Sequence, residues 1–165
     1  MMNIKFKALE EKDLIEVKKI YDWYVANTMV TCHIQSVSEE GLKEFIYINH
    51  PRYKSYLVFC DDEIAGYCYL TCYRKREAFN QTAEIAIYLK QEYCQKGIGK
   101  MAFHFLEKEA RKVGLRNLIG NVTGENHGSI ALFEKSGYTK CAHLKNIGEK
   151  FNRQLDIISF QKEIG

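Results

Sequence analysis

The sequence has a single proline, Pro51, and it lacks any stretch rich in serine and glycine or in charges of one sign. Linkers and disordered tails are usually built from such stretches. Their scarcity predicts one continuous domain over residues 1–165. With 46% apolar and 13% aromatic residues, a chain of this length can bury a substantial hydrophobic core.

Long apolar runs are also missing, and no segment reaches the length of a membrane span. Residues 1–13 are charged where a signal peptide would be apolar. We therefore expect a cytoplasmic protein with no membrane contact. The net charge of +3 comes from scattered lysines and arginines, which argues against a nucleic-acid partner and leaves a small polyanionic ligand open.

Metal-ligand spacing is absent as well. The six cysteines contain no C-x-x-C pair, and the five histidines show no metal-binding spacing. Cys68 and Cys72 are the most suggestive pair, but four residues along a strand separate their Cα atoms by roughly 13 Å, too far to share a zinc ion. We expect no bound metal, and reduced, buried thiols rather than a disulfide framework.

What the sequence does contain is a strand, a glycine turn and a helix in succession. Residues 84–89 alternate as a strand, Gly97 and Gly99 form the turn, and apolar residues then recur at helical spacing up to Val113. The first amides of a helix are unpaired and carry partial positive charge, and glycine lets an anion approach the backbone. The pattern predicts an anion site, although glycines that serve only the turn would look the same.

The glycine pair fits two kinds of phosphate-binding loop. Residues 97–102 formally match G-x-G-x-x-A, the dinucleotide fingerprint, so a dinucleotide-binding oxidoreductase is one alternative. That motif follows its strand almost directly, whereas here residues 90–96 intervene and more than half of the chain precedes it. The P-loop pattern G-x-x-x-x-G-K-[ST] has no match.

Several separate sequence motifs resemble those of the GNAT (GCN5-related) N-acetyltransferases. Residues 94–99 are similar to their acyl-CoA loop, [RQ]-x-x-G-x-[GA], with Cys94 where the family usually has Arg or Gln. Three further segments resemble motifs of the phosphinothricin/methionine sulfoximine acetyltransferase branch: residues 82–84 (TAE), 124–132 (GENHGSIAL) and 150–156 (KFNRQLD). The resemblance covers nearly the whole chain.

This resemblance implies an enzyme that transfers an acetyl group from acetyl-CoA to the primary amine of a small amino-acid-like substrate. It implies that Glu84 is the catalytic base. For acetyl-CoA, it implies binding residues in three segments: Ile87, Tyr88, Leu89, Gln95, Lys96, Gly97, Ile98, Gly99, Lys100, Asn126 and Ser129. It also implies a homodimer.

The acceptor residues follow from the same resemblance and from charge. The resemblance places Arg74 and Phe79 near the acceptor. Lys150 and Arg153 in the late KFNRQ loop are further candidates, because cations can hold the carboxylate of an amino acid while its amine faces Glu84. Competing functions are a CoA-binding protein without catalysis, or a GNAT enzyme that acts on a protein N-terminus, an aminoglycoside or a polyamine.

Each candidate also has a plainer interpretation. Glu84 would otherwise be an exposed strand carboxylate, whereas partial burial beside Ile85 and Ile87 would raise its pKa toward that of a working base. Asn126 is a favoured helix N-cap, a role that is compatible with a ligand contact. The cations of the 73–81 loop would be solvated, and the 27–35 loop, a candidate substrate wall, would be a plain connection between helices.

The resemblance does not identify a residue that protonates the departing thiolate of CoA. Phe133 stands where many family members have a tyrosine near the end of the second CoA-side helix. Either another group protonates the departing thiolate, or it leaves unprotonated.

The expected order of elements is β-α-α-β-β-β-α-β-α-β-β, an α+β fold. The resemblance implies a mixed, mostly antiparallel GNAT sheet with about four helices and a splayed strand pair that binds acetyl-CoA. The second helix is expected to carry Leu42, Phe45 and Ile46 inward. The closing strands are expected at 138–144 and 155–161, with a loop between them.

Overall fold

The sheet of the computed structural model, which describes residues 1–165, has seven strands in the order β1-β2-β3-β4-β5-β7-β6. All neighbouring strands are antiparallel except β4 and β5, which are parallel. The strands are β1 Ile4–Ala8, β2 Ser55–Cys60, β3 Glu63–Cys72, β4 Thr82–Leu89, β5 Asn117–Thr123, β6 Thr139–Lys150 and β7 Arg153–Glu163. This mixed sheet confirms the expected fold class.

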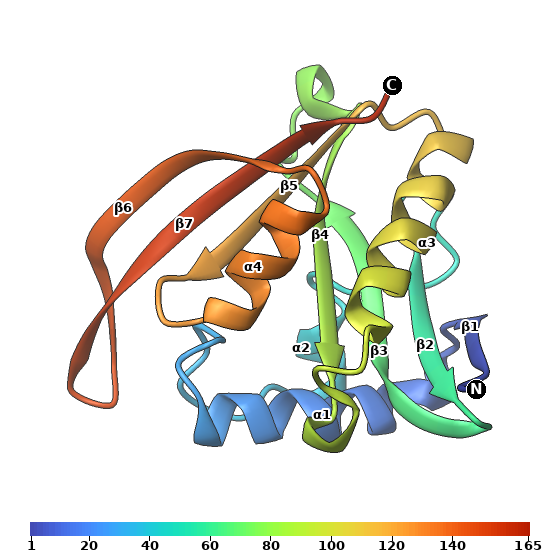
Figure 1. Cartoon of the computed structure of the whole chain (residues 1–165), viewed down its shortest axis with the longest axis horizontal. Coiled ribbons are helices and arrows are strands. Elements are labelled where there is room, and N and C mark those ends of the chain that lie inside the picture. The colour runs from blue at the N-terminus through green and yellow to red at the C-terminus, as the bar shows by residue number, and fades with distance from the viewer.

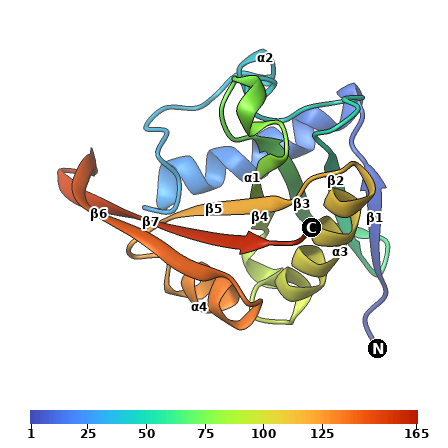
Figure 2. The same cartoon turned by 90° about the horizontal axis from the view of Figure 1, so that it is seen from above.

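Four α-helices cover the two faces of the sheet. They are α1 Leu14–Asn27, α2 Glu39–Leu42, α3 Ile98–Lys112 and α4 His127–Lys135. Figure 2 shows α1 and α2 on one face and α3 and α4 on the other, with a hydrophobic core on each side. None of these helices is long and apolar enough to cross a membrane.

The second helix is shorter than the sequence suggests. Ser38 caps α2, since its hydroxyl accepts a hydrogen bond of 3.0 Å from the Gly41 amide. The helix ends at Leu42. Ile46 lies in the turns that follow the helix, and its side chain is buried. A glycine inside a helix costs about 1 kcal/mol relative to alanine, which does not favour a longer α2.

The last two strands form a hairpin arm, so the predicted loop between them is wrong. Phe151 and Asn152 both have positive φ, 53° and 58°, and make a two-residue turn between β6 and β7. β5 pairs with β7 only from Ile157 onward, so the outer part of the arm projects beyond the sheet (Figure 1). Much of this part is exposed, and it therefore lacks the apolar alternation that indicates a half-buried strand.

All six cysteines are free, as expected. Cys60 and Cys68 are buried, but Cys32 and Cys141 are exposed, so the prediction of buried thiols is wrong for these two. Cys32 lies in the loop between α1 and α2, and Cys141 lies on β6, the edge strand of the sheet.

The feature that shapes the centre of the molecule is the short pairing between β4 and β5. Residues 82–84 pair with residues 117–119, and beyond Glu84 the two strands diverge (Figure 1). β4 remains paired with β3 as far as Leu89. The backbone groups of 85–89 that point away from β3 therefore have no strand partner, and such groups need a hydrogen-bonding partner from elsewhere.

Candidate active site

Glu84 is the last residue of β4 that pairs with β5. Alternation along the strand turns its side chain toward the α1 face, together with Tyr88, while Ile85 enters the core beneath α3. Burial raises the pKa of the Glu84 carboxyl above its ordinary value of 4.5, and the nearby Asn121 amide opposes that rise. A carboxylate with a raised pKa can accept a proton near neutral pH.

Aromatic side chains line the sheet on the α1 side of Glu84. The rings of Tyr21 and Tyr88 meet edge to face at 5.6 Å, and the Tyr21 hydroxyl lies 2.5 Å from Nδ1 of His33. Burial raises the pKa of Tyr21 to about 12 and also raises the pKa values of Tyr69 and Tyr88. These hydroxyls are therefore neutral at pH 7. The sequence reasoning missed this cluster, although tyrosines at alternate strand positions were a signal.

Lys150 joins the arm to the loop between α1 and α2. Its ammonium group donates to the carbonyl oxygen and the hydroxyl of Thr31, at 3.0 and 3.1 Å. The residue is only 2% exposed, and burial lowers its pKa. The candidate substrate wall at 27–35 is thus tied to the arm, and a direct contact of Lys150 with substrate stays a prediction.

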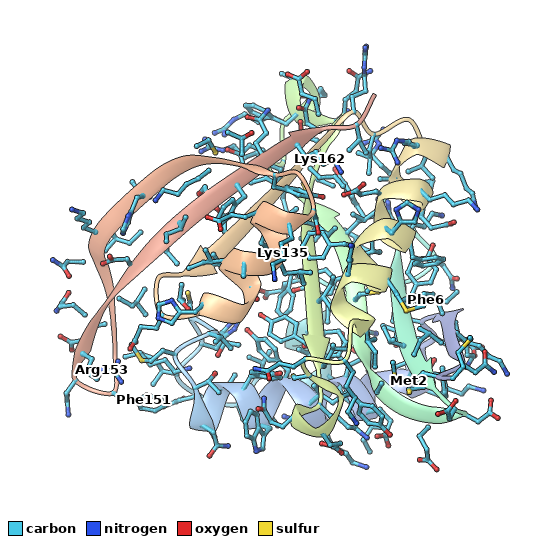
Figure 3. The ribbon with its side chains drawn as sticks, viewed as in Figure 1. Met2, Phe6, Lys135, Phe151, Arg153 and Lys162 are labelled. Carbon is cyan, nitrogen blue, oxygen red and sulfur yellow. The ribbon has the colours of Figure 1, made fainter.

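Arg74 and Phe79 are brought together at the end of β4 that the 73–81 loop enters. The Arg74 guanidinium lies 5.2 Å from the ring centre of Tyr73 and 5.9 Å from that of Phe79. Arg74 forms no ion pair, so its N–H groups are available to a ligand. Arg153 lies instead at the outer end of the arm (Figure 3), where it is ion-paired with Glu125.

The segment before α3 has the features of an anion site. Gly97 adopts a φ of +83° at the N-cap position, and no side chain caps the helix. The amides of Ile98, Gly99 and Lys100 have no partner, because the first helical bond runs from Met101 to Gly97. Gly99 lies close to α4, since a Cβ there would be 2.9 Å from Leu132 Cδ2. An anion can therefore approach bare backbone amides at this helix end.

A groove of about 640 Å³ continues from this loop across α3. It is lined by Gly97 and by four basic side chains, and it extends between Phe6 and Lys135 on either side of α3 (Figure 3). The basic residues are Lys100, His104, Lys108 and Lys135. No carboxylate lines this groove, so its charge favours a polyanionic ligand.

Asn126 caps α4, as the sequence predicted. Its side-chain oxygen accepts a hydrogen bond of 3.2 Å from the Ser129 amide. The NH₂ group of Asn126 remains free for another partner. Contacts of Asn126 and Ser129 with the cosubstrate stay predictions.

Phe133 is a core residue. Its ring stacks on Phe160 at 5.1 Å and fills the space beside Gly120, where a Cβ would lie 2.0 Å from the ring. It has no proton to donate. The structure therefore offers no general acid at this position, and it contains no group of three His, Cys, Asp or Glu side chains that could hold a metal ion.

Tyr24 holds the end of β4 next to the glycine loop, which the sequence reasoning missed. Its hydroxyl donates to the Leu89 carbonyl oxygen and accepts a hydrogen bond of 3.2 Å from the Gln91 side chain. The Cys94 thiol donates to the Lys90 carbonyl oxygen at 3.6 Å.

Known proteins are similar to this chain in sequence over nearly its full length. The L-methionine sulfoximine/L-methionine sulfone acetyltransferase of Salmonella typhimurium is 25% identical over 166 residues, covering 99% of this chain and 95% of that protein. The L-amino acid N-acyltransferase MnaT of Escherichia coli is 24% identical, covering 99% and 94%.

The fold comparison agrees with the sequence comparison. The crystal structure of a GNAT superfamily phosphinothricin acetyltransferase from Sinorhizobium meliloti, in complex with AcCoA, matches with a TM-score of 0.90. It is 27% identical, covering 98% of this chain and 89% of that chain. Residues 6–158 match the family model described as acetyltransferase (GNAT) domain, and the chain therefore belongs to the GNAT acetyltransferase family.

Proposed function

We propose that this protein transfers the acetyl group of acetyl-CoA to the primary amine of a small amino-acid-like substrate. The observation that carries the proposal is Glu84, a carboxyl with a raised pKa at the point where β4 and β5 diverge. Relatives named for methionine sulfoximine, amino-acid acylation and phosphinothricin support this substrate class.

In this proposal acetyl-CoA lies between β4 and β5. The unpaired amides of 98–100 and the lysines beside them bind the pyrophosphate, and the backbone groups of 87–89 that lack a strand partner on the β5 side bind the pantetheine arm. Asn126 and Ser129 complete the site from α4. The thioester then reaches the sheet from the α3 side, and the acceptor reaches it from the α1 side.

The chemistry follows from this placement. Glu84 takes a proton from the amine, directly or through water, so that a neutral nitrogen attacks the thioester carbonyl. Free N–H groups of β4 stabilise the oxyanion that develops, and the C–S bond then breaks. Phe133 carries no proton, so the thiolate of CoA either takes its proton from another group or leaves as such and is protonated by solvent.

Recognition of the acceptor rests on its carboxylate. The Arg74 guanidinium, held against Tyr73 and Phe79, presents N–H groups that can bind a carboxylate in a bidentate pair. Lys75 and Arg76 are exposed in the same loop and repel a polycationic acceptor. A free amino acid therefore suits the site better than a polyamine.

We also propose that the protein is a homodimer, as in the branch that it resembles. Three large apolar side chains of the arm, Leu144, Ile147 and Phe151, are 48–55% exposed in the single chain, and their burial against a second copy would favour association. Light scattering during gel filtration should give twice the chain mass. Ile147→Asp should lower the mass toward that of one chain, whereas a monomeric parent would contradict the proposal.

The acetyl-transfer proposal is tested with purified protein, acetyl-CoA and detection of released thiol. Acceptors should include free amino acids, methionine sulfoximine, phosphinothricin, amino amides, a polyamine and a peptide. We expect turnover with free α-amino acids or their analogues. Faster turnover with the polyamine or the peptide would contradict the acceptor class, and saturable acetyl-CoA binding without turnover on any amine would indicate a binding protein.

A further inference from the structure

Three polar side chains from three adjacent strands, those of Ser159, Asn121 and Glu84, lie next to one another on the sheet. The hydroxyl of Ser159 on β7 donates to Oδ1 of Asn121 on β5 at 2.6 Å. Asn121 in turn lies close enough to the Glu84 carboxyl on β4 to lower its pKa. The strand register explains the contact, since Asn121 pairs with Ser159 and Glu84 pairs with Ile119, two residues before Asn121.

We propose that Asn121 is a positioning residue for Glu84 and that Ser159 fixes the orientation of the Asn121 amide. The inference rests on the proposed role of Glu84 as the base. It adds to that role a polar support from β5 and β7, which the motifs of the sequence do not contain.

The direction of the amide follows from its donor and acceptor groups. A carboxamide has one oxygen that accepts and one NH₂ group that donates. Because the Ser159 hydroxyl occupies the Asn121 oxygen, the NH₂ group is left to face Glu84. A donor of this kind stabilises the ionised carboxylate and limits the rotation of a flexible side chain.

No charged side chain contributes to this environment of Glu84. Burial raises its pKa, and the neighbouring Asn121 amide opposes that rise. The titratable group that faces Glu84 is Tyr69 on β3, whose own pKa is raised by burial and by the nearby tyrosines and Glu84, so it is neutral in the working range. Asn121 is thus placed to keep a partly buried base ionised at neutral pH.

The same two strands contain a matched control. The side chains of Gln161 on β7 and Asn117 on β5 form a second cross-strand hydrogen bond of 3.1 Å. Asn117 pairs with Thr82 rather than with Glu84. Asn117→Ala therefore removes an equivalent amide from the same strand without touching the Glu84 contact.

The test is a direct titration of Glu84 by carbon-detected NMR of protein with labelled glutamate, assigned with Glu84→Gln. Removing the donor in Asn121→Ala should raise the Glu84 pKa by about half a unit to one unit. Ser159→Ala should raise it less, because the amide remains but is no longer oriented. Asn117→Ala should leave it unchanged.

The pH dependence of kcat/KM separates this inference from the proposed function. Since the carboxylate is the active form, a raised pKa moves the rising limb of the profile to higher pH, and the rate at pH 9 should remain close to that of the parent. A Glu84 pKa that is unchanged in Asn121→Ala, or that moves equally in Asn117→Ala, would overturn the inference. If the Glu84 pKa rises in Asn121→Ala while the rising limb of the kcat/KM profile does not move, the result would support the role of Asn121 beside Glu84 and contradict Glu84 as the base.

Discussion

Withdrawal of the Glu84 carboxylate from water destabilises the folded protein, and this effect depends on pH. The folded pKa is raised above 4.5, so the folded chain binds more protons than the unfolded chain between these two values. Stability from this group is therefore lost as the pH rises through the folded pKa. We expect Glu84→Gln to gain free energy of unfolding relative to the parent between pH 4.5 and pH 8, as measured by urea unfolding. A difference that is constant over this range would contradict the raised pKa.

Arg74 is the residue on which carboxylate recognition depends in the proposed function. Loss of a charged hydrogen bond in Arg74→Ala removes about 1.5–3 kcal/mol of binding, so KM for the amino acid should rise by about 10- to 100-fold. KM for acetyl-CoA should stay within a factor of about two. Steady-state kinetics of Arg76→Ala provide the control, because Arg76 is exposed in the same loop. Equal acetylation of an amino acid and its amide would show that the carboxylate is not recognised.

Sequence reasoning at the residue scale succeeds where the signal is local. The Asn126 N-cap could be predicted because the groups that it joins lie three residues apart. Tyr24 and Lys150 could not, because their hydrogen-bond partners lie 65 and 119 residues away. Asn121 was missed for the same reason, since its hydrogen-bond partner Ser159 lies 38 residues away and Glu84 is on another strand.

At the scale of elements, the junction between β4 and α3 depends on a glycine that local geometry requires. Gly97 has a φ of +83°, and Gly114, at the other end of α3, has a φ of +82°; neither has an atom within 4 Å of a Cβ position. Alanine at either site should cost about 1–2 kcal/mol of stability. Only Gly97→Ala should also raise KM for acetyl-CoA, by about tenfold or more, because relief of the strain moves the amides of 98–100. Chemical unfolding and steady-state kinetics on both variants measure the two effects.

The two glycine variants form a matched pair. Equal acetyl-CoA KM values in Gly97→Ala and Gly114→Ala would contradict the assignment of the Gly97 loop to the acetyl-CoA site. Gly114 follows an amphipathic helix, a position at which glycine with a positive φ is common.

Elements were predictable from the sequence where one side is buried. β4 and α3 follow the expected alternation and helical spacing because both pack on the core beneath them. The outer part of the arm was not predictable from the sequence, since exposed residues such as Lys145 and Asn146 show no periodic burial. α2 was overestimated because Phe45 and Ile46 are packed inward without being helical.

At the scale of the whole molecule, the sheet separates two chemically different sides. The α3 side presents unpaired amides and a basic groove, whereas the α1 side presents Glu84 and neutral tyrosines. The diverging strands β4 and β5 lie between these sides (Figure 1). An acyl donor with phosphate groups and a small amine can therefore approach the same point without competing for space.

The measurement that tests this account most directly is the turnover of Glu84→Gln with saturating acetyl-CoA and a free amino acid. Glutamine keeps the shape of the side chain but cannot take up the proton of the amine. We predict that kcat falls by about 10²- to 10⁴-fold while the Kd for acetyl-CoA, measured by calorimetry, stays within a factor of about two. A kcat within twofold of the parent would contradict the role of Glu84 as the base.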